Sequence, residues 1–173
     1  MTKDMIFEQT FDNERNLQYV NGEASVMHCH HYATIFTKLA LDMSGLKGRQ
    51  NLFDAMEETA YLTLQRYFIV ESVKSIEEKI FIVERYYALS GLGQLHLSVK
   101  ENGGRVSMKH SHVDEGWIKK WGRHKTPVNL IGQGYLAGAL SAVFRKPIGF
   151  YHIQETQSIV SGASTSEFTI STR

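Results

Sequence analysis

The stretch Gln94-Leu95-His96-Leu97-Ser98-Val99-Lys100 alternates between apolar and polar residues, and Asn102-Gly103 follows it closely. Strict alternation predicts a β-strand with one buried face, and Asn-Gly is typical of a tight turn between antiparallel strands. A return strand would place four residues on the same face as the apolar ones: Val106, Met108, His110 and His112. We therefore predict a β-hairpin whose apolar face continues into two histidines.

Apolar residues at helical spacing flank this hairpin on both sides, and further strand patterns lie near the two ends of the chain. The predicted helices cover residues 29 or 30 to 43, 52–70, 75–91, 115–121 (capped by Asp114) and 126–145. The other predicted hairpins pair residues 16–20 with 24–28, and 148–159 with 166–171. Hairpins separated by helices indicate an α+β fold. We predict a single domain over residues 1–173, in which an antiparallel sheet of about four to five strands has helices packed on one face.

Two of the predicted helices have informative faces. In the helix that ends at residue 43, large apolar residues recur at helical spacing, and we expect them to face the core: Tyr32, Ile35, Phe36, Leu39 and Met43. In the helix that begins at Thr126-Pro127, the small residues Gly134, Gly138 and Ala142 recur every four positions. Such a smooth side lets another backbone, or a ligand, approach closely.

The composition argues against several classes of protein. Hydrophobic residues make up 42% of the chain and charged residues 21%, and the formal net charge of +1 gives no electrostatic reason to expect nucleic acid. No apolar run approaches membrane-spanning length, the N-terminus lacks the long apolar run of a signal peptide, and a single cysteine fits a reducing compartment. We expect a cytoplasmic protein that binds neither nucleic acid nor membrane.

The stretch Val26-Met27-His28-Cys29-His30-His31-Tyr32 holds three of the eight histidines and the only cysteine. Imidazole and thiol are common metal ligands, and they also serve as base and nucleophile. If the helix begins slightly early, His28 and His31 lie one turn apart and can share a ligand. We expect the fold to bring His110 and His112 towards them, and zinc or iron would suit these ligands. The alternative is a helix cap with its histidines in solvent.

The second half of the chain resembles the 4-vinyl reductase domain, also called the hydrocarbon-binding domain. The resemblance covers residues 91–170: the central hairpin, the run Gly134-Tyr135-Leu136-Ala137-Gly138-Ala139 after Pro127-Val128, and the ending from Glu155 to Phe168. Members of the family often end in a glutamate followed by Cys-x-x-x-Gly-x-x-x-Cys-x-Phe. Here the glutamate, the glycine and the phenylalanine are in place, but both cysteines are serines, Ser158 and Ser166.

This resemblance implies a mixed fold with an antiparallel sheet and an interior apolar pocket. Relatives include sensor domains of aromatic-responsive transcription activators, proteins linked to bacteriochlorophyll synthesis and subunits of a vesicle-tethering complex, and many of them form dimers. Several bind zinc through the C-terminal cysteines. That zinc site does not carry over here, because a serine hydroxyl is a poor zinc ligand beside a thiolate. A metal in this chain would need other ligands, for which the histidine-rich stretch is the natural candidate.

Three functions follow from these observations. The first is a homodimeric module that binds an apolar or aromatic small molecule between the sheet and the small-residue helix, in a pocket lined or covered by Tyr87, His110, His112, Trp117, Trp121 and Tyr135. The second is an enzyme. It would use a metal held by His28, His31, His110 and His112, with Asp114 or Glu155 as carboxylate, or it would be a hydrolase with Cys29 as nucleophile. The third is an interaction subunit with structural histidines.

Overall fold

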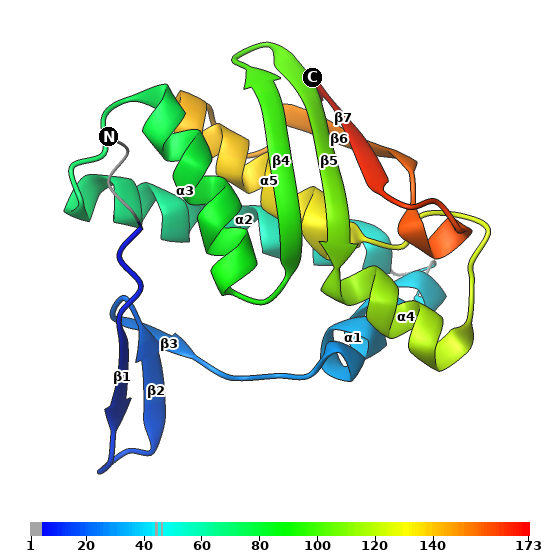
Figure 1. Cartoon of the computed structure of the whole chain (residues 1–173), viewed down its shortest axis with the longest axis horizontal. Coiled ribbons are helices and arrows are strands. Elements are labelled where there is room, and N and C mark those ends of the chain that lie inside the picture. Colours follow the sequence, from blue (N-terminus) through cyan, green and yellow to red (C-terminus); the bar gives the residue numbers. More distant parts are fainter. Residues whose placement is uncertain (1–4, 44, 46) are drawn as a thin grey trace.

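The computed structural model describes residues 5–43, 45 and 47–173. The described elements form two antiparallel sheets and five α-helices (Figure 1). In chain order they are β1 (Gln9–Asp12), β2 (Leu17–Val20), β3 (Glu23–Ser25), α1 (His30–Asp42), α2 (Gly48–Val70), α3 (Ile76–Leu89), β4 (Gly93–Lys100), β5 (Gly103–Ser111), α4 (His112–Trp121), α5 (Leu130–Phe144), β6 (Tyr151–Gln157), the 3₁₀ turn η2 (Ile159–Ser161) and β7 (Ser166–Thr172).

The main sheet has four strands in the order β4-β5-β7-β6, and every neighbouring pair is antiparallel. Helices α2, α3 and α5 lie on one face of this sheet (Figure 1). The main hydrophobic core fills the space between sheet and helices, and its fully buried members include Tyr87, Met108, Leu136 and Phe168. This arrangement confirms the predicted α+β fold and the central hairpin.

The N-terminal strands form a separate three-stranded sheet, β1-β2-β3, and do not extend the main sheet. The predicted hairpin is present as β2 and β3, with the turn at Asn21-Gly22, where both residues have positive φ. Strand β1 was not predicted, and the expected strand character of residues 26–28 is absent. Residues 26–29 form an extended linker that carries the chain from this small sheet to α1 (Figure 1).

Close contact between α2 and α5 explains the small residues of α5. A Cβ atom at Gly138 would lie 2.0 Å from the backbone oxygen of Glu57, and one at Gly134 would lie 2.4 Å from that of Phe53. Both distances are far shorter than any contact between non-bonded atoms, so the two helices can be this close only with glycine there. The smooth side of α5 therefore receives another backbone, one of the two alternatives that the sequence allowed.

Helix α1 lies the other way round from the predicted orientation. Its apolar stripe points outward, with exposed fractions between 40% and 55%: Tyr32, Ile35, Phe36, Leu39 and Met43. The buried side is made of Ala33, Thr34, Thr37 and Ala40. Small side chains are needed there because Gly116 of α4 and Gly48 of α2 approach this side closely. The expectation that the stripe faces the core is wrong.

A β-bulge corrects the predicted face of the central hairpin. Gln94 pairs with His110, but the next residue, Leu95, pairs with Met108, so Lys109 is an extra residue on β5. A bulge of this kind reverses the alternation of side chains beyond it. Met108 is therefore buried, whereas His110 is exposed. His112 has left the strand altogether and is the first residue of α4.

Two helices also begin at other residues than predicted. The N-cap of α4 is Ser111, whose hydroxyl accepts the Asp114 backbone N–H, so Asp114 lies inside the first turn. The N-cap of α5 is Asn129, not Thr126, and its side chain accepts the Gly132 backbone N–H. None of the helices in the described part of the chain combines the length and apolar character needed to cross a membrane. The cytoplasmic location stays a prediction.

Candidate functional site

A pocket of about 590 Å³ lies between the extended linker and α2, and residues of both line it. Its walls come from the small sheet, the linker, α1, α2, the C-terminal end of α3 and the starts of α4 and α5. We call it the linker pocket, and it is lined by Phe7, Gln9, Gln18, Val20, Ser25, Val26, Met27, His28, Tyr32, Ala33, Phe36, Leu52, Met56, Tyr86, Leu89, Ser90, Gly91, Leu92, His112 and Ile131. Most of these side chains are apolar or aromatic.

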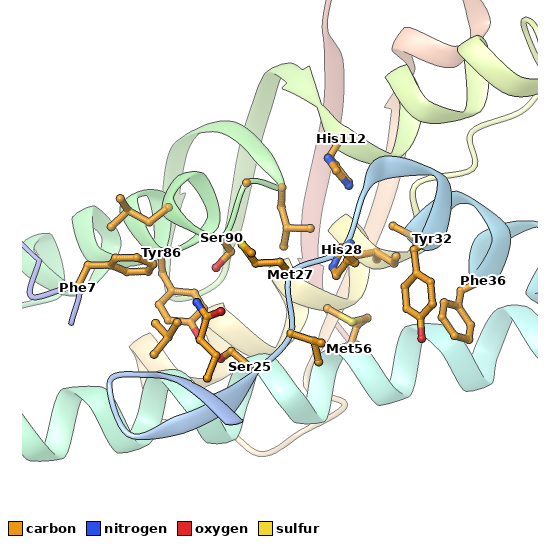
Figure 2. A pocket seen from close by; sticks show the side chains of 18 of the residues that line it. Phe7, Ser25, Met27, His28, Tyr32, Phe36, Met56, Tyr86, Ser90 and His112 are labelled. Atoms are coloured by element: carbon orange, nitrogen blue, oxygen red, sulfur yellow. The ribbon is translucent and has the colours of Figure 1, made fainter. Parts of the chain in front are cut away.

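The linker pocket has two distinct ends. Figure 2 shows Phe7 and Tyr86 at one end, and His28, His112 and Tyr32 at the other, with Met27 and Met56 between them. The rings of His28 and Tyr32 are 5.7 Å apart, and those of Tyr32 and Phe36 are 4.8 Å apart. The histidine end therefore combines aromatic walls with imidazole nitrogens.

Three histidine rings meet beside this end of the pocket. The ring of His112 lies 5.7 Å from that of His28 and 5.8 Å from that of His30. His31 stands next to His30, with the ring centroids 4.5 Å apart. The Nε2 atoms of His30 and His112 are buried, and neither has a hydrogen-bond partner among the described residues. The predicted approach of His112 to the first histidine group is thus present in the structure.

The surroundings of His112 disfavour its charged form. Burial lowers its pKa, and so do the neighbouring rings of His28 and His30, whereas the Cys29 carbonyl and the Glu115 carboxylate act in the opposite direction. A lowered pKa leaves the imidazole neutral at pH 7, with one nitrogen as donor and the other as acceptor. His112 can therefore donate a hydrogen bond to a bound molecule or accept one from it.

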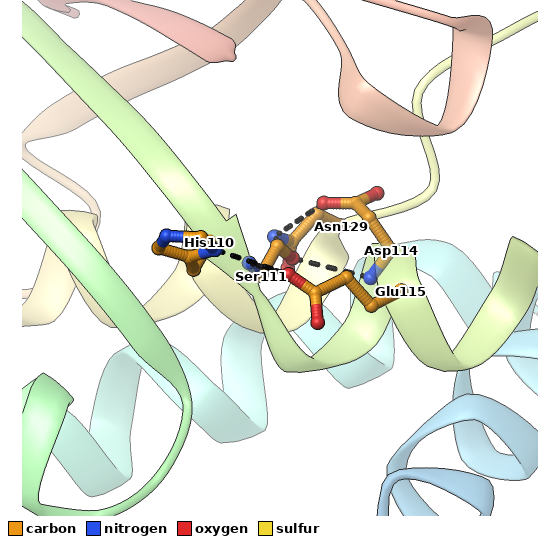
Figure 3. Close-up of polar contacts among 5 residues, drawn as sticks. All are labelled: His110, Ser111, Asp114, Glu115 and Asn129. Atoms are coloured by element: carbon orange, nitrogen blue, oxygen red, sulfur yellow. Dashed lines mark hydrogen bonds and ion pairs between the residues drawn. The ribbon is translucent and has the colours of Figure 1, made fainter. Parts of the chain in front are cut away.

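The four predicted metal ligands are only partly assembled. His28 and His112 are neighbours and His31 adjoins His30, but His110 faces away, with its Nδ1 3.5 Å from a carboxylate oxygen of Glu115 (Figure 3). Among residues 5–43, 45 and 47–173, no three His, Cys, Asp or Glu side chains are grouped so that they could hold one metal ion. Zinc or iron stays a prediction.

The other residues predicted for the pocket lie elsewhere. Tyr87 and Tyr135 are buried in the main core with ring centroids 4.7 Å apart, and the Tyr135 hydroxyl donates to the backbone oxygen of Val83. Trp117 packs with Val128 and Val160 in a separate small cluster. Of the predicted pocket residues, His112 is the one that lines the linker pocket.

Trp121 and Cys29 are both on the surface. Trp121 stacks against Trp117 with the ring centroids 4.8 Å apart, and 38% of it is exposed. Cys29 is exposed and is the N-cap residue of α1, and its side chain makes no capping hydrogen bond. It lies between His28 and His30, so the nucleophile prediction stays open.

Sequence reasoning missed the hydrophobic half of the pocket. Met56, Leu89 and Leu92 were not among the predicted pocket residues, because nothing in a helical stripe distinguishes a pocket wall from a packed interior. Phe7 belongs to a segment for which no structure was predicted. Met27 was placed in the predicted strand of residues 24–28, so its place in the extended linker beside the pocket could not be read from the sequence.

The arrangement of sheet and helices defines the class of fold. An antiparallel sheet in the order β4-β5-β7-β6, with helices on one face, is the fold of 4-vinyl reductase domains, as the resemblance of residues 91–170 implied. A vinyl-4-reductase family protein from Methanocaldococcus jannaschii superposes with a TM-score of 0.58 at 16% identity, covering 86% of this chain and 84% of that one.

A second solved structure is similar over nearly the whole chain. The phenol-responsive sensory domain of the transcription activator PoxR, determined with phenol, superposes with a TM-score of 0.79 at 14% identity, covering 95% of this chain and 84% of that one. No protein-family model matches the sequence, and no curated protein does. At these identities the likeness establishes the fold.

Proposed function

We propose that this chain binds an aromatic or apolar small molecule in the linker pocket. The observation that carries the proposal is the pocket itself: about 590 Å³, mostly apolar walls, and two histidines at one end. Pockets for small molecules typically have this volume, with a few polar groups that fix the orientation of the ligand. The phenol-bound sensory domain with the same fold adds support for an aromatic ligand.

The histidine end suits a ligand that carries a hydroxyl group. The Nε2 atom of His112 is buried and has no hydrogen-bond partner among the described residues. A buried polar atom without a partner is unfavourable, and a ligand hydroxyl beside His112 would supply one. The rings of Tyr32 and Phe36 would then pack against the aromatic part of the ligand.

Isothermal titration calorimetry with phenol tests this function. Toluene, which has a methyl group in place of the hydroxyl, serves as the comparison ligand. Met56→Trp would fill the middle of the pocket, and Leu62→Trp is the matched control, because Leu62 is an exposed residue of the same helix outside the linker pocket. We expect wild type and Leu62→Trp to bind phenol alike and Met56→Trp to lose at least about tenfold in affinity. Equal phenol binding by all three would contradict the proposal.

We propose further that the chain acts as a homodimer. The outward apolar stripe of α1 continues into the linker, where Val26 and Met27 are more than 80% exposed. Large contiguous apolar patches are unusual on monomers and mark interaction sites. A second copy placed on the same patch would cover both apolar stripes at once, as in two-fold symmetric dimers.

Metal binding by the histidine group is the second candidate function. The observation in its favour is that the rings of both His28 and His30 lie within 6 Å of His112. Side-chain rotations would have to bring their nitrogens together around zinc or iron, and a water on such a metal would give an enzyme its nucleophile. Elemental analysis of wild type and His112→Ala tests this. Bound metal that is lost in the variant supports it, and metal-free wild type after growth with adequate metal removes it.

A further inference from the structure

A buried group of polar side chains lies near the start of α4, and none of its members lines the linker pocket. We call it the oxygen cluster, and its members are at most 7% exposed: Ser111, Asp114, Asn129, Glu155, Ser158 and Ser166. They come from three parts of the chain: the junction of β5 and α4, the start of α5, and the β6–η2–β7 segment, in which Glu155 lies in β6, Ser158 precedes η2 and Ser166 begins β7. Such a group costs free energy to bury unless its members satisfy one another.

Asn129 is the centre of the hydrogen bonds in this cluster. Its Nδ2 donates to Ser111 Oγ at 3.1 Å and to Asp114 Oδ2 at 3.2 Å, while its Oδ1 accepts the Gly132 backbone N–H at 2.8 Å. Figure 3 shows Asn129 beside Ser111 and Asp114 at the first turn of α4. One side chain thus ties the start of α5 to the start of α4.

The two serines of the C-terminal motif organise the turn between β6 and β7. Ser158 Oγ accepts the Val160 backbone N–H at 3.3 Å, and Ser166 Oγ accepts the Ile159 backbone N–H at 3.0 Å. Both hydroxyls therefore act as caps for η2. They also lie close enough to Glu155 to stabilise its charged form and so oppose the rise of its pKa.

The carboxyl groups of the cluster are incompletely paired. Asp114 Oδ1 is buried without a hydrogen-bond partner among the described residues. The charge of Glu155 is stabilised only by the Ser158 and Ser166 hydroxyls and the Asn129 backbone N–H, which connects strand β6 to the start of α5. The two groups are close enough that the charge of Asp114 raises the pKa of Glu155, second only to burial. The causes of the two pKa shifts are burial, the neighbouring carboxylates and hydrogen bonds from nearby side chains and backbone. The cluster thus holds two acids and several hydroxyls around a common interior.

This donor set does not fit the zinc site that the family resemblance implies. Glu155, Ser158 and Ser166 occupy the positions of the glutamate and the two cysteines in the family's ending. Thiolates are strong zinc ligands, whereas neutral hydroxyls are weak ones. Both hydroxyls are also already engaged with backbone N–H groups. The positions agree with a zinc site, but the chemistry does not.

We propose that the oxygen cluster is a metal-free replacement for a metal centre, in which hydrogen bonds join the same segments, and that cysteines at positions 158 and 166 alone would convert it into a metal site. The replacement has a consequence for the rest of the molecule. The cluster fixes the first turn of α4 through Ser111 and Asp114. His112, which directly follows Ser111 in that turn, lines the linker pocket. The inference does not depend on the proposed ligand.

Cobalt(II) titration of the full chain tests this, because thiolate ligands give Co(II) intense near-ultraviolet absorption. The two proteins are wild type and Ser158→Cys/Ser166→Cys. We expect stoichiometric Co(II) with thiolate absorption in the double variant, weakened when Glu155→Gln is added, and no thiolate band from the cluster in wild type. We also expect EDTA to leave the melting temperature of wild type unchanged and to lower that of the metal-loaded double variant.

Two outcomes would overturn the proposal. One is metal in purified wild type that is lost in Glu155→Gln but retained in His112→Ala, since the cluster itself would then be a metal site. The other is a folded double variant, judged by circular dichroism, that shows no thiolate absorption with Co(II). If the double variant does not fold, wild type still tests the proposal. A metal-free cluster is contradicted if EDTA lowers the melting temperature of wild type and zinc restores it, while neither affects the melting temperature of Glu155→Gln.

Discussion

The imidazole ring of His112, at the start of α4, lies 5.7 Å from that of His28, at the end of the linker. The contact connects the linker to the start of α4 at the polar end of the linker pocket (Figure 2). Burial and the neighbouring His28 ring lower the pKa of His112, so the neutral imidazole is the favoured form of His112. A ligand with a hydroxyl group can bridge the two rings without bringing a charge into the pocket.

Replacing His112 should therefore weaken binding selectively. We expect His112→Ala to reduce the affinity for phenol roughly tenfold, the usual contribution of one buried hydrogen bond, and to leave the affinity for toluene nearly unchanged. His96→Ala is the matched control, because His96 is largely exposed on β4 and does not line the pocket. Isothermal titration calorimetry measures the affinity of each protein for both ligands. Equal losses for phenol and toluene would assign His112 a packing role only.

The sequence correctly predicts the elements whose local residue pattern agrees with their packing in the fold. The alternation of residues 94–100 and the turn at Asn102 led to the correct hairpin, and the repeated glycines of α5 led to a close helix contact. These predictions succeed because a strand with one buried face has only one good orientation. A helix that approaches another backbone closely likewise needs small residues at fixed spacing.

The wrong predictions concern features that depend on tertiary contacts and not on the local sequence. The bulge at Lys109 depends on how β4 and β5 pair, and it moved His110 to the surface. The stripe of α1 has the correct spacing but faces outward, because its small side fits the close approach of Gly116 and Gly48. Periodicity identifies the apolar face of a helix, but it does not say whether this chain or another covers that face.

The oxygen cluster predicts an unusual dependence of stability on pH. Burial, followed by the charge of Asp114, raises the pKa of Glu155 from its ordinary 4.5 to about 7, and burial raises the pKa of Asp114 from 3.8 to about 6. The folded state then binds these protons more tightly than the unfolded chain does. Raising the pH from about 4 to about 7 therefore removes stability.

Urea unfolding at pH 5 and pH 8 measures this effect. The Glu155→Gln variant has no carboxyl group at this position and should not lose this stability as the pH rises. The unfolding free energy of wild type, relative to that of the variant, should therefore fall by on the order of 2 kcal/mol between pH 5 and pH 8. Glu58→Gln, at an exposed position of α2, should follow wild type. A difference that stays constant between the two pH values would show that Glu155 titrates normally.

The glycine contact between α2 and α5 should be intolerant of a methyl group. A Cβ at position 138 would meet the Glu57 backbone oxygen at 2.0 Å, and a backbone atom cannot move aside cheaply. We expect Gly138→Ala to lower the free energy of unfolding by about 3 kcal/mol or more. Gly45→Ala, where a Cβ meets nothing within 4 Å, should change it little. Thermal unfolding of both variants decides, and a Gly138→Ala protein as stable as wild type would refute this packing.

The outward stripe of α1 would be the contact surface of the proposed homodimer. Leu39 is half exposed at the centre of that stripe, so a charge placed there would be buried without a partner in the dimer but solvated in the monomer. We expect Leu39→Asp to convert a dimer into a monomer in size-exclusion chromatography with light scattering. Ile148→Asp, at a similarly exposed apolar position outside α1, should leave the mass unchanged. If wild type is already monomeric at micromolar concentration, the stripe is not a stable interface between copies of this chain.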